Sequence, residues 1–137
     1  MLNSSDTTYL SLLEKADSAR ENAYCAYSNF KVGAALLTKS GNIIFGSNVE
    51  NASYGLTNCA ERSAIFAAIS RGIKPQEIDA IAISATGENF SPCGACRQVI
   101  FEMGSQIAVI FRFNGKVVIE RISDLLPYSF TITINGQ

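Results

Sequence analysis

Histidine is absent from this chain of 137 residues, and its absence restricts the metal sites that the chain can build. A zinc site here has to find its ligands among the four cysteines and the acidic residues. The stretch "SPCGACRQVI", residues 91–100, places two of these cysteines three positions apart, directly after a proline. Such a pair can be a redox couple, half of a metal site or ordinary packing. Any further ligands have to come from elsewhere in the chain.

Runs of basic residues are also absent. The 11 Lys and Arg residues and the 12 Asp and Glu residues leave a formal net charge of −1, and the basic residues form no cluster in the sequence. Binding to nucleic acid or to an anionic membrane usually requires a basic patch. We therefore expect neither nucleic acid nor a membrane as a partner.

A secretion signal and long apolar runs are missing as well. The first residues, "MLNSSDTTYL", contain neither the basic nor the apolar region of a signal peptide. Apolar stretches such as "IDAIAISA" are too short to span a membrane. Cysteines without a secretion signal indicate a reducing compartment, where thiols bind metal or do chemistry and disulfides are rare. We expect a cytoplasmic protein.

The residues that are present predict an ordinary globular protein. Hydrophobic residues make up 47% of the chain and charged residues 17%. The length fits one domain, residues 1–137, and a domain of this size buries roughly two-thirds of its unfolded surface.

The hydrophobic pattern predicts three helices. The first begins near Asp6 or Thr7, and its apolar residues recur at helical spacing, at Leu10, Leu13, Ala16, Ala19 and Ala23. Two further helices are expected over residues 59–72 and 93–104, each ending at a glycine.

Five strands are expected between and after these helices. Residues 30–50 read as a hairpin around Ser40-Gly41-Asn42, and residues 107–122 as a second hairpin around the turn-forming pair Asn114-Gly115. Residues 77–86 form a nearly continuous apolar run, typical of a strand covered on both faces. The order of elements predicts a three-layer α/β/α domain with a mixed five-stranded sheet whose last two strands are antiparallel.

Cys59 is the feature that favours a metal site over a redox pair. It lies in "NCAERSA", at the start of a predicted helix, just as Cys93 and Cys96 lie at the start of another. Three thiolates from two helix starts make a three-ligand zinc site with one open position, as catalytic zinc requires. Cys25 has no ligand-type spacing, and we expect a buried small thiol there.

Charge at this site needs compensation, because zinc with three thiolates carries a net charge of −1. Both groups of cysteines lie at helix N-termini, where the partial positive charge favours thiolate. Arg62 follows Glu61 and Arg97 follows Cys96, so both can donate hydrogen bonds to the sulfurs, although each can also be a surface residue in a salt bridge.

Glu61 is the candidate catalytic residue. A carboxylate beside zinc-bound water can take its proton and pass it on, as general base and then general acid. Taken alone, an acidic residue in a first helical turn is simply favourable for the helix. Here it stands two positions after a candidate zinc ligand.

Together these elements resemble the zinc deaminases. Cys-Ala-Glu followed by Pro-Cys-x-x-Cys matches their H-x-E…P-C-x-x-C signature, with cysteine in place of histidine. The chain is similar to the cytidine deaminase family, in the small homotetrameric form that acts on free nucleosides. The resemblance covers nearly the whole chain, in "YSNFKVGAAL", "NVENASYG", "NCAERSAI", "SPCGACRQV" and "LLPYSF".

The resemblance implies a function: hydrolytic deamination of cytidine and 2′-deoxycytidine to the uridines and ammonia, in pyrimidine salvage. A zinc-activated hydroxide would attack C4, and Glu61 would be the proton shuttle. It also implies one zinc ion per subunit, held by Cys59, Cys93 and Cys96.

The resemblance assigns the substrate contacts too. Phe30 would pack on the pyrimidine, and Asn48 and Glu50 would hydrogen-bond the ribose 3′-hydroxyl. The backbone around Cys59 and Ala60 would bind the base carbonyl, and the Ser91 carbonyl the leaving amino group. Tyr54 and Phe130 would reach the site of a neighbouring subunit, which implies a homotetramer with shared active sites.

Two departures and three rivals accompany this interpretation. Ala26 stands where the family often has proline, and the tail "TITINGQ" does not resemble the family's usual ending. A blasticidin-type deaminase is the nearest rival, against which "NVENASYG" argues. A polynucleotide deaminase would usually show a basic face and a histidine ligand. A non-catalytic, zinc-stabilised binding module would make Glu61 dispensable.

Overall fold

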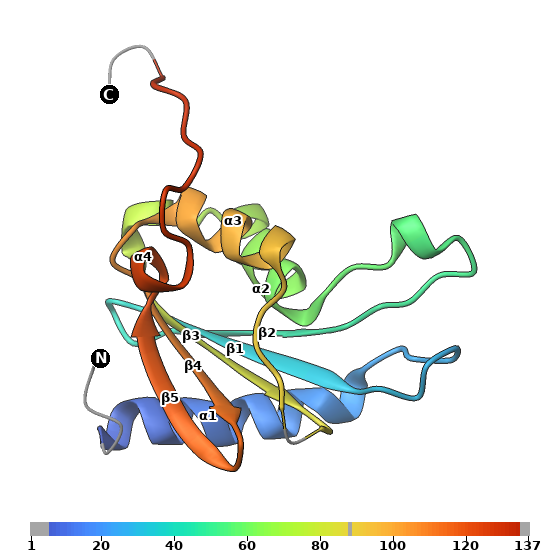
Figure 1. Cartoon of the computed structure of the whole chain (residues 1–137). Coiled ribbons are helices and arrows are strands. Elements are labelled where there is room, and N and C mark those ends of the chain that lie inside the picture. Colours follow the sequence, from blue (N-terminus) through green and yellow to red (C-terminus); the bar gives the residue numbers. More distant parts are fainter. Residues whose placement is uncertain (1–5, 88, 135–137) are drawn as a thin grey trace.

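The computed structural model describes residues 6–87 and 89–134. A five-stranded sheet forms its middle layer (Figure 1). The strands are β1 (Val32–Thr38), β2 (Ile43–Ser47), β3 (Ile78–Ala85), β4 (Ala108–Phe113) and β5 (Lys116–Arg121). In space they follow the order β2-β1-β3-β4-β5.

The sheet is mixed, as the sequence predicted. β3 and β4 are parallel, because α3 lies between them in the chain and returns it to the same end of the sheet. The other neighbouring pairs, including the last pair β4 and β5, are antiparallel. β3 is buried along most of its length, which confirms the expectation of a strand covered on both faces.

Helices cover both faces of the sheet (Figure 1). α1 (Thr7–Ala19) lies on one face, and α2 (Ala60–Ser70), α3 (Gly94–Met103) and the short α4 (Ile122–Leu125) lie on the other. Alternate residues of the strands feed the two cores: Ile81 and Ile83 pack in the α2 and α3 layer, whereas Ala80 and Ala82 pack in the α1 layer. The three-layer prediction is confirmed, and only the single-turn α4 was too short to be read from periodicity.

The two predicted hairpin turns are present. Gly41 has φ +96° in the β1–β2 turn, and Asn114 and Gly115 have φ +53° and +75° in the β4–β5 turn. Positive φ at both central residues is the geometry of a two-residue hairpin turn, which explains the Asn-Gly pair.

The first helix differs from the prediction at both its buried face and its end. Leu12 lies in the core, whereas Leu10 is only half-buried. The α-helix ends at Ala19, followed by a single 3₁₀ turn, Arg20–Asn22, so Ala23 is not helical. The chain leaves the helix because the backbone of Tyr24 hydrogen-bonds to Asn48 and Glu50.

Two glycines let helices lie directly on the sheet. A Cβ at Gly33 would come within 2.3 Å of the Ala16 carbonyl oxygen and the Arg20 nitrogen of the first helix and turn. A Cβ at Gly46 would come within 2.5 Å of the Ala60 carbonyl oxygen and the Ala64 nitrogen of α2. The second contact fixes the start of α2, and therefore Cys59 and Glu61, against β2.

Two segments project beyond the sheet at the same end, residues 24–31 and residues 48–58 (Figure 1). The second contains a 3₁₀ turn, Tyr54–Leu56. Within the described residues, no helix is long and apolar enough to cross a membrane.

Candidate metal centre and its acid

Cys59 is the N-cap residue of α2. Ala60, Ala64 and Ala68 on the inner side of this helix are fully buried, and their small side chains allow the close contact with β2. The helix start is therefore held by the sheet, and the Cys59 sulfur stands at a fixed place at its end.

Cys93 is the N-cap residue of α3, directly after Pro92. The Cys93 sulfur accepts a hydrogen bond from the Cys96 backbone N–H at 3.4 Å, as a capping side chain does. Cys96 is fully buried and Cys93 is exposed. The spacing of three residues therefore places one sulfur inside the protein and one at its surface, on the same end of the helix.

The three sulfurs form one cluster. The Sγ atoms of Cys59, Cys93 and Cys96 all lie within 4.8 Å of one another. In a tetrahedral site with Zn–S bonds of about 2.3 Å the sulfurs lie about 3.8 Å apart, a spacing within this limit, so the three sulfurs could hold a single zinc ion. Cys25 is buried and lies outside the cluster.

The thiols of the cluster differ in acidity. A hydrogen bond from Cys96, together with Arg62, lowers the pKa of Cys59 to about 5, although burial opposes the shift. The same contact with Cys59, together with burial, raises the pKa of Cys96. The contact between these two sulfurs therefore favours the thiolate on Cys59 and the proton on Cys96.

Arg62 supplies the positive charge beside this thiolate. Its Nη2 donates to the Cys59 sulfur at 3.1 Å, and this contact raises the pKa of Arg62. The Arg62 Nε is buried without a hydrogen-bond partner among the described residues. The guanidinium is therefore held by sulfur rather than by a protein carboxylate.

Glu61 is buried beside the cluster, with 2% of its surface exposed. Its Oε1 is a buried atom without a hydrogen-bond partner in the described part of the chain. Burial, with the negative charge of Cys59, raises the pKa of Glu61 to about 7. A buried carboxyl group with an unsatisfied oxygen is costly for folding, and such groups are typical of sites that move protons.

A comparison with known proteins identifies the family from most of the chain. Residues 6–112 match the family model described as the cytidine and deoxycytidylate deaminase zinc-binding region. The chain belongs to this family. Its members are zinc-dependent hydrolases, so the chain is an enzyme of the cytidine deaminase family.

Individual relatives cover nearly the full length. A cytidine deaminase of Halalkalibacterium halodurans is 50% identical over 123 residues, which cover 88% of this chain and 92% of the relative. The crystal structure of a cytidine deaminase from Burkholderia pseudomallei aligns with a TM-score of 0.86 and 50% identity, covering 90% of this chain and all of that chain. A blasticidin-S deaminase of Bacillus cereus is 34% identical over 130 residues, covering 87% of this chain and 91% of the relative.

Arg97, for which the sequence left open a contact with sulfur or a place at the surface, binds oxygen atoms of the flanking segments. Its guanidinium donates to the Pro92 carbonyl at 2.8 Å, the Leu125 carbonyl at 2.8 Å and the Ser91 hydroxyl at 3.3 Å. Arg97 is the fourth residue of α3, and its side chain turns toward α4 and the loop before the helix, so among the described residues it donates to oxygen atoms and to no sulfur. In this member of the deaminase family Arg97 holds the loop that delivers Cys93.

Asn48 and Glu50 both turn toward the segment that carries Phe30. The Asn48 side chain accepts from the Val32 N–H at 2.9 Å and donates to the Phe30 carbonyl at 2.8 Å. The Glu50 carboxylate accepts from the N–H groups of Tyr27 and Ser28 and from the Ser28 hydroxyl. The contact with Ser28 lowers the pKa of Glu50.

Ser28 is a residue of this site that the sequence did not single out. Its hydroxyl donates to Glu50 and accepts from the Phe30 N–H at 3.0 Å, so it links these two predicted substrate contacts. It lies inside the motif "YSNFKVGAAL", but a lone serine in a loop carries no signal of such a role.

The remaining predicted contacts lie around the cluster or on the surface. Ala60 is fully buried at the start of α2, and Ser91 is half-buried two residues before Cys93. Phe30 is 41% exposed, Phe130 68% and Tyr54 80%, so the three aromatic side chains are open to a ligand or a second chain. Phe130 is attached to the body by its carbonyl, which accepts from Gln98 at 2.9 Å.

Proposed function

We propose that the chain hydrolyses free cytidine and 2′-deoxycytidine to uridine and 2′-deoxyuridine with release of ammonia. The observation that carries the proposal is the cluster of three cysteine sulfurs beside a buried glutamate, one of whose carboxyl oxygens has no hydrogen-bond partner among the described residues. The choice of substrate is supported by the 50% identity with a relative named cytidine deaminase.

The metal would be zinc, one ion per chain, held by Cys59, Cys93 and Cys96. Three protein ligands leave one position for water, and zinc lowers the pKa of such a water toward about 7. The N-termini of α2 and α3 and the Arg62 guanidinium would offset the negative charge of the thiolates.

Glu61 would handle the proton. As a carboxylate it accepts a proton from the attacking water, and as an acid it gives that proton to N3 of the pyrimidine. It then transfers the second proton of the water to the amino group on C4, which leaves as ammonia. Burial raises the pKa of the Glu61 carboxyl, which favours its protonated form and so its ability to give a proton back.

The pyrimidine and the sugar would be bound by residues around this centre. We assign the ring face to Phe30, the base carbonyl to the backbone at Cys59 and Ala60, and the leaving amino group to the Ser91 carbonyl. Glu50 would take the ribose 3′-hydroxyl, because its Oε2 accepts only from Ser28 among the described residues. Asn48, buried and bonded to the segment around Phe30, would mainly hold that segment in place.

The complete site would need a second chain. Tyr54 and Phe130 are exposed on projecting segments, and aromatic side chains of this kind are enriched in interfaces. We propose a homotetramer in which these residues complete a neighbouring subunit's site. The thiol cluster suits a reducing cytoplasm, and free nucleosides as substrates place the enzyme in pyrimidine salvage.

The direct test is to incubate the metal-analysed protein with cytidine and to follow the ultraviolet change to uridine. We expect turnover that is lost after chelation and restored by zinc. Conversion of blasticidin S but not of cytidine would favour the blasticidin-type rival. A zinc-loaded protein that converts neither compound would support the binding-module alternative.

A further inference from the structure

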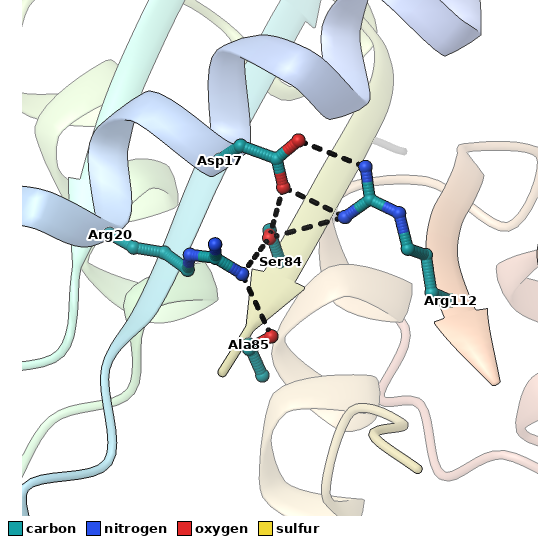
Figure 2. A network of polar contacts seen from close by, with 5 residues as sticks. All are labelled: Asp17, Arg20, Ser84, Ala85 and Arg112. Atoms are coloured by element: carbon teal, nitrogen blue, oxygen red, sulfur yellow. Dashed lines mark hydrogen bonds and ion pairs between the residues drawn. The ribbon is translucent and has the colours of Figure 1, made fainter. Parts of the chain in front are cut away.

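A polar network joins α1, β3 and β4 at one end of the sheet (Figure 2). Asp17 of α1 accepts from Arg112 of β4 at 2.7 and 2.9 Å and from the Ser84 hydroxyl of β3. Arg20, just after α1, donates through Nη1 to the Ser84 hydroxyl at 3.0 Å and to the Ala85 carbonyl at 2.9 Å. Ser84 is therefore the residue at which the contacts of Arg20 and Asp17 meet.

The network lies where the pairing of β3 with β4 has ended. The last paired residues of these strands are Ala82 and Ile110, whereas β3 continues beside β1 as far as Ala85. The end of β3 is therefore supported by β1 on one side only. On the other side Arg20 takes the place of a neighbouring strand, because it binds the Ala85 carbonyl and the Ser84 side chain.

The position of Arg20 is itself fixed by close packing. Gly33 is paired with Ser84 across the strands, and its α-carbon lies directly against the end of α1. Any larger residue at Gly33 would meet the Arg20 backbone nitrogen at 2.3 Å. The backbone of Arg20 is therefore held rigidly against β1, the strand next to the one that carries Ser84 and Ala85.

The segment after Ala85 supports the proposed pyrimidine contact. The Thr86 N–H donates to the Lys31 carbonyl at 3.1 Å, and the Lys31 N–H donates back to the Thr86 hydroxyl at 3.3 Å. A Cβ on Gly87 would lie 3.4 Å from the Phe30 ring. Gly87 thus lies behind the Phe30 ring, and Thr86 holds Lys31, the residue after Phe30. We call Thr86 and Gly87 the wall behind Phe30; it begins one residue after the carbonyl that Arg20 holds.

The charges of the network keep it assembled at neutral pH. Burial opposes ionisation of Asp17, but the hydrogen bonds from Arg112 and Ser84 outweigh it and lower the Asp17 pKa. Asp17 therefore remains an acceptor for Ser84, whose oxygen is left to accept from Arg20.

We propose that Arg20 is a positioning residue for the substrate site: by fixing the end of β3 it sets the wall of Thr86 and Gly87 against which Phe30 rests. The proposal rests on the function proposed above, since Phe30 matters only if it contacts the pyrimidine. Its effect is expected on substrate binding, because Arg20 contacts neither the cysteines nor Glu61.

The test compares Arg20→Gln and Ser84→Ala with the wild-type enzyme. Both variants weaken the hold on Ala85, and we expect KM for cytidine to rise by about three- to tenfold while kcat and zinc content stay close to wild type. Arg20→Lys, which keeps the charge and one donor, should recover part of the increase. Arg121→Gln is the matched control, because Arg121 also donates to a carbonyl, that of Gln106, but at the opposite end of the sheet.

A second measurement does not depend on activity. The amide resonances of Thr86 and Gly87 in a nitrogen-15 correlation spectrum should shift in Arg20→Gln and stay in place in Arg121→Gln. Unchanged KM and unchanged resonances in Arg20→Gln would overturn the proposal, as would a joint loss of kcat and zinc, which would show a general effect on the fold. A wild-type protein inactive on cytidine would instead refute the proposed function. The resonances of Thr86 and Gly87 would still test whether Arg20 positions these two residues.

Discussion

The starts of α2 and α3 both contribute cysteines to the sulfur cluster, yet they differ in what surrounds the sulfur. At α2, the Cys59 thiolate receives a hydrogen bond from Arg62, and Glu61 is buried beside it. At α3, the neighbouring arginine turns away from sulfur and binds two carbonyls and a hydroxyl of the flanking segments. The two helix starts look alike in sequence, as Cys-x-Glu-Arg and Cys-x-x-Cys-Arg, but only the first places an arginine on sulfur and a buried carboxyl beside it.

This difference assigns separate tasks to the two helices. In the proposed function α2 supplies one ligand, the counter-charge and the acid, whereas α3 supplies two ligands, one at its N-cap and one in its first turn. A change at α2 should therefore alter chemistry without unfolding the protein, and a change at Arg97 should alter stability more than chemistry. Substitutions at each helix start test this difference between α2 and α3.

The largest effect is expected for Cys96→Ala. This substitution removes the buried ligand, so the remaining two sulfurs should not retain zinc, and turnover should fall to background. The measurement is zinc content after gel filtration together with cytidine turnover. Cys25→Ala is the control, because Cys25 is also buried but lies outside the cluster. Stoichiometric zinc in Cys96→Ala would contradict the three-thiolate assignment.

A smaller effect is expected for Arg62→Gln. Loss of a charged hydrogen bond to a thiolate should weaken zinc affinity by about 10- to 100-fold, in the range seen when groups that support metal ligands are removed. Competition with a chelator measures the affinity, and circular dichroism should show an intact fold. Arg71→Gln, at the exposed end of the same helix, should have no effect. Equal affinities for the Arg62 and Arg71 variants would show that the contact with sulfur has no role.

The smallest effect on the metal is expected for Arg97→Gln. Its three hydrogen bonds to the loop and α4 should make it contribute about 1–3 kcal/mol to the free energy of unfolding, while zinc affinity stays close to that of the wild type. Urea unfolding of the zinc-loaded protein and the same chelator competition measure the two quantities. If Arg97→Gln lost as much zinc affinity as Arg62→Gln, the two helix starts would not differ in their role at the metal.

Much of the fold could be predicted because its signals are local. The turn pairs Gly41-Asn42 and Asn114-Gly115 and the apolar run of β3 each specify their own conformation. The three cysteines could be brought together from the sequence because each lies at the start of a helix, next to Glu61 or Pro92. These features depend on neighbours in the chain, so a single sequence is enough to read them.

The rest depends on contacts between distant segments. Arg62 and Arg97 each follow a site residue, and only the packed structure separates the one that reaches sulfur from the one that reaches Leu125. Asn48 is buried because the segment around Phe30 covers it, and Ser84 meets Asp17 only after α1 lies on the sheet. No periodicity or spacing in the sequence encodes such encounters.

Glu61 is assigned to proton transfer beside a metal that other residues hold, and the substitution Glu61→Gln separates these two roles. Zinc content and cytidine turnover should be measured on the same preparation, with the wild type alongside. We predict about one zinc ion per chain in both proteins, and a turnover in the variant lower by about 10²- to 10⁴-fold. Turnover close to wild type, or loss of the zinc together with the activity, would contradict the assignment of separate roles to the cysteines and the acid.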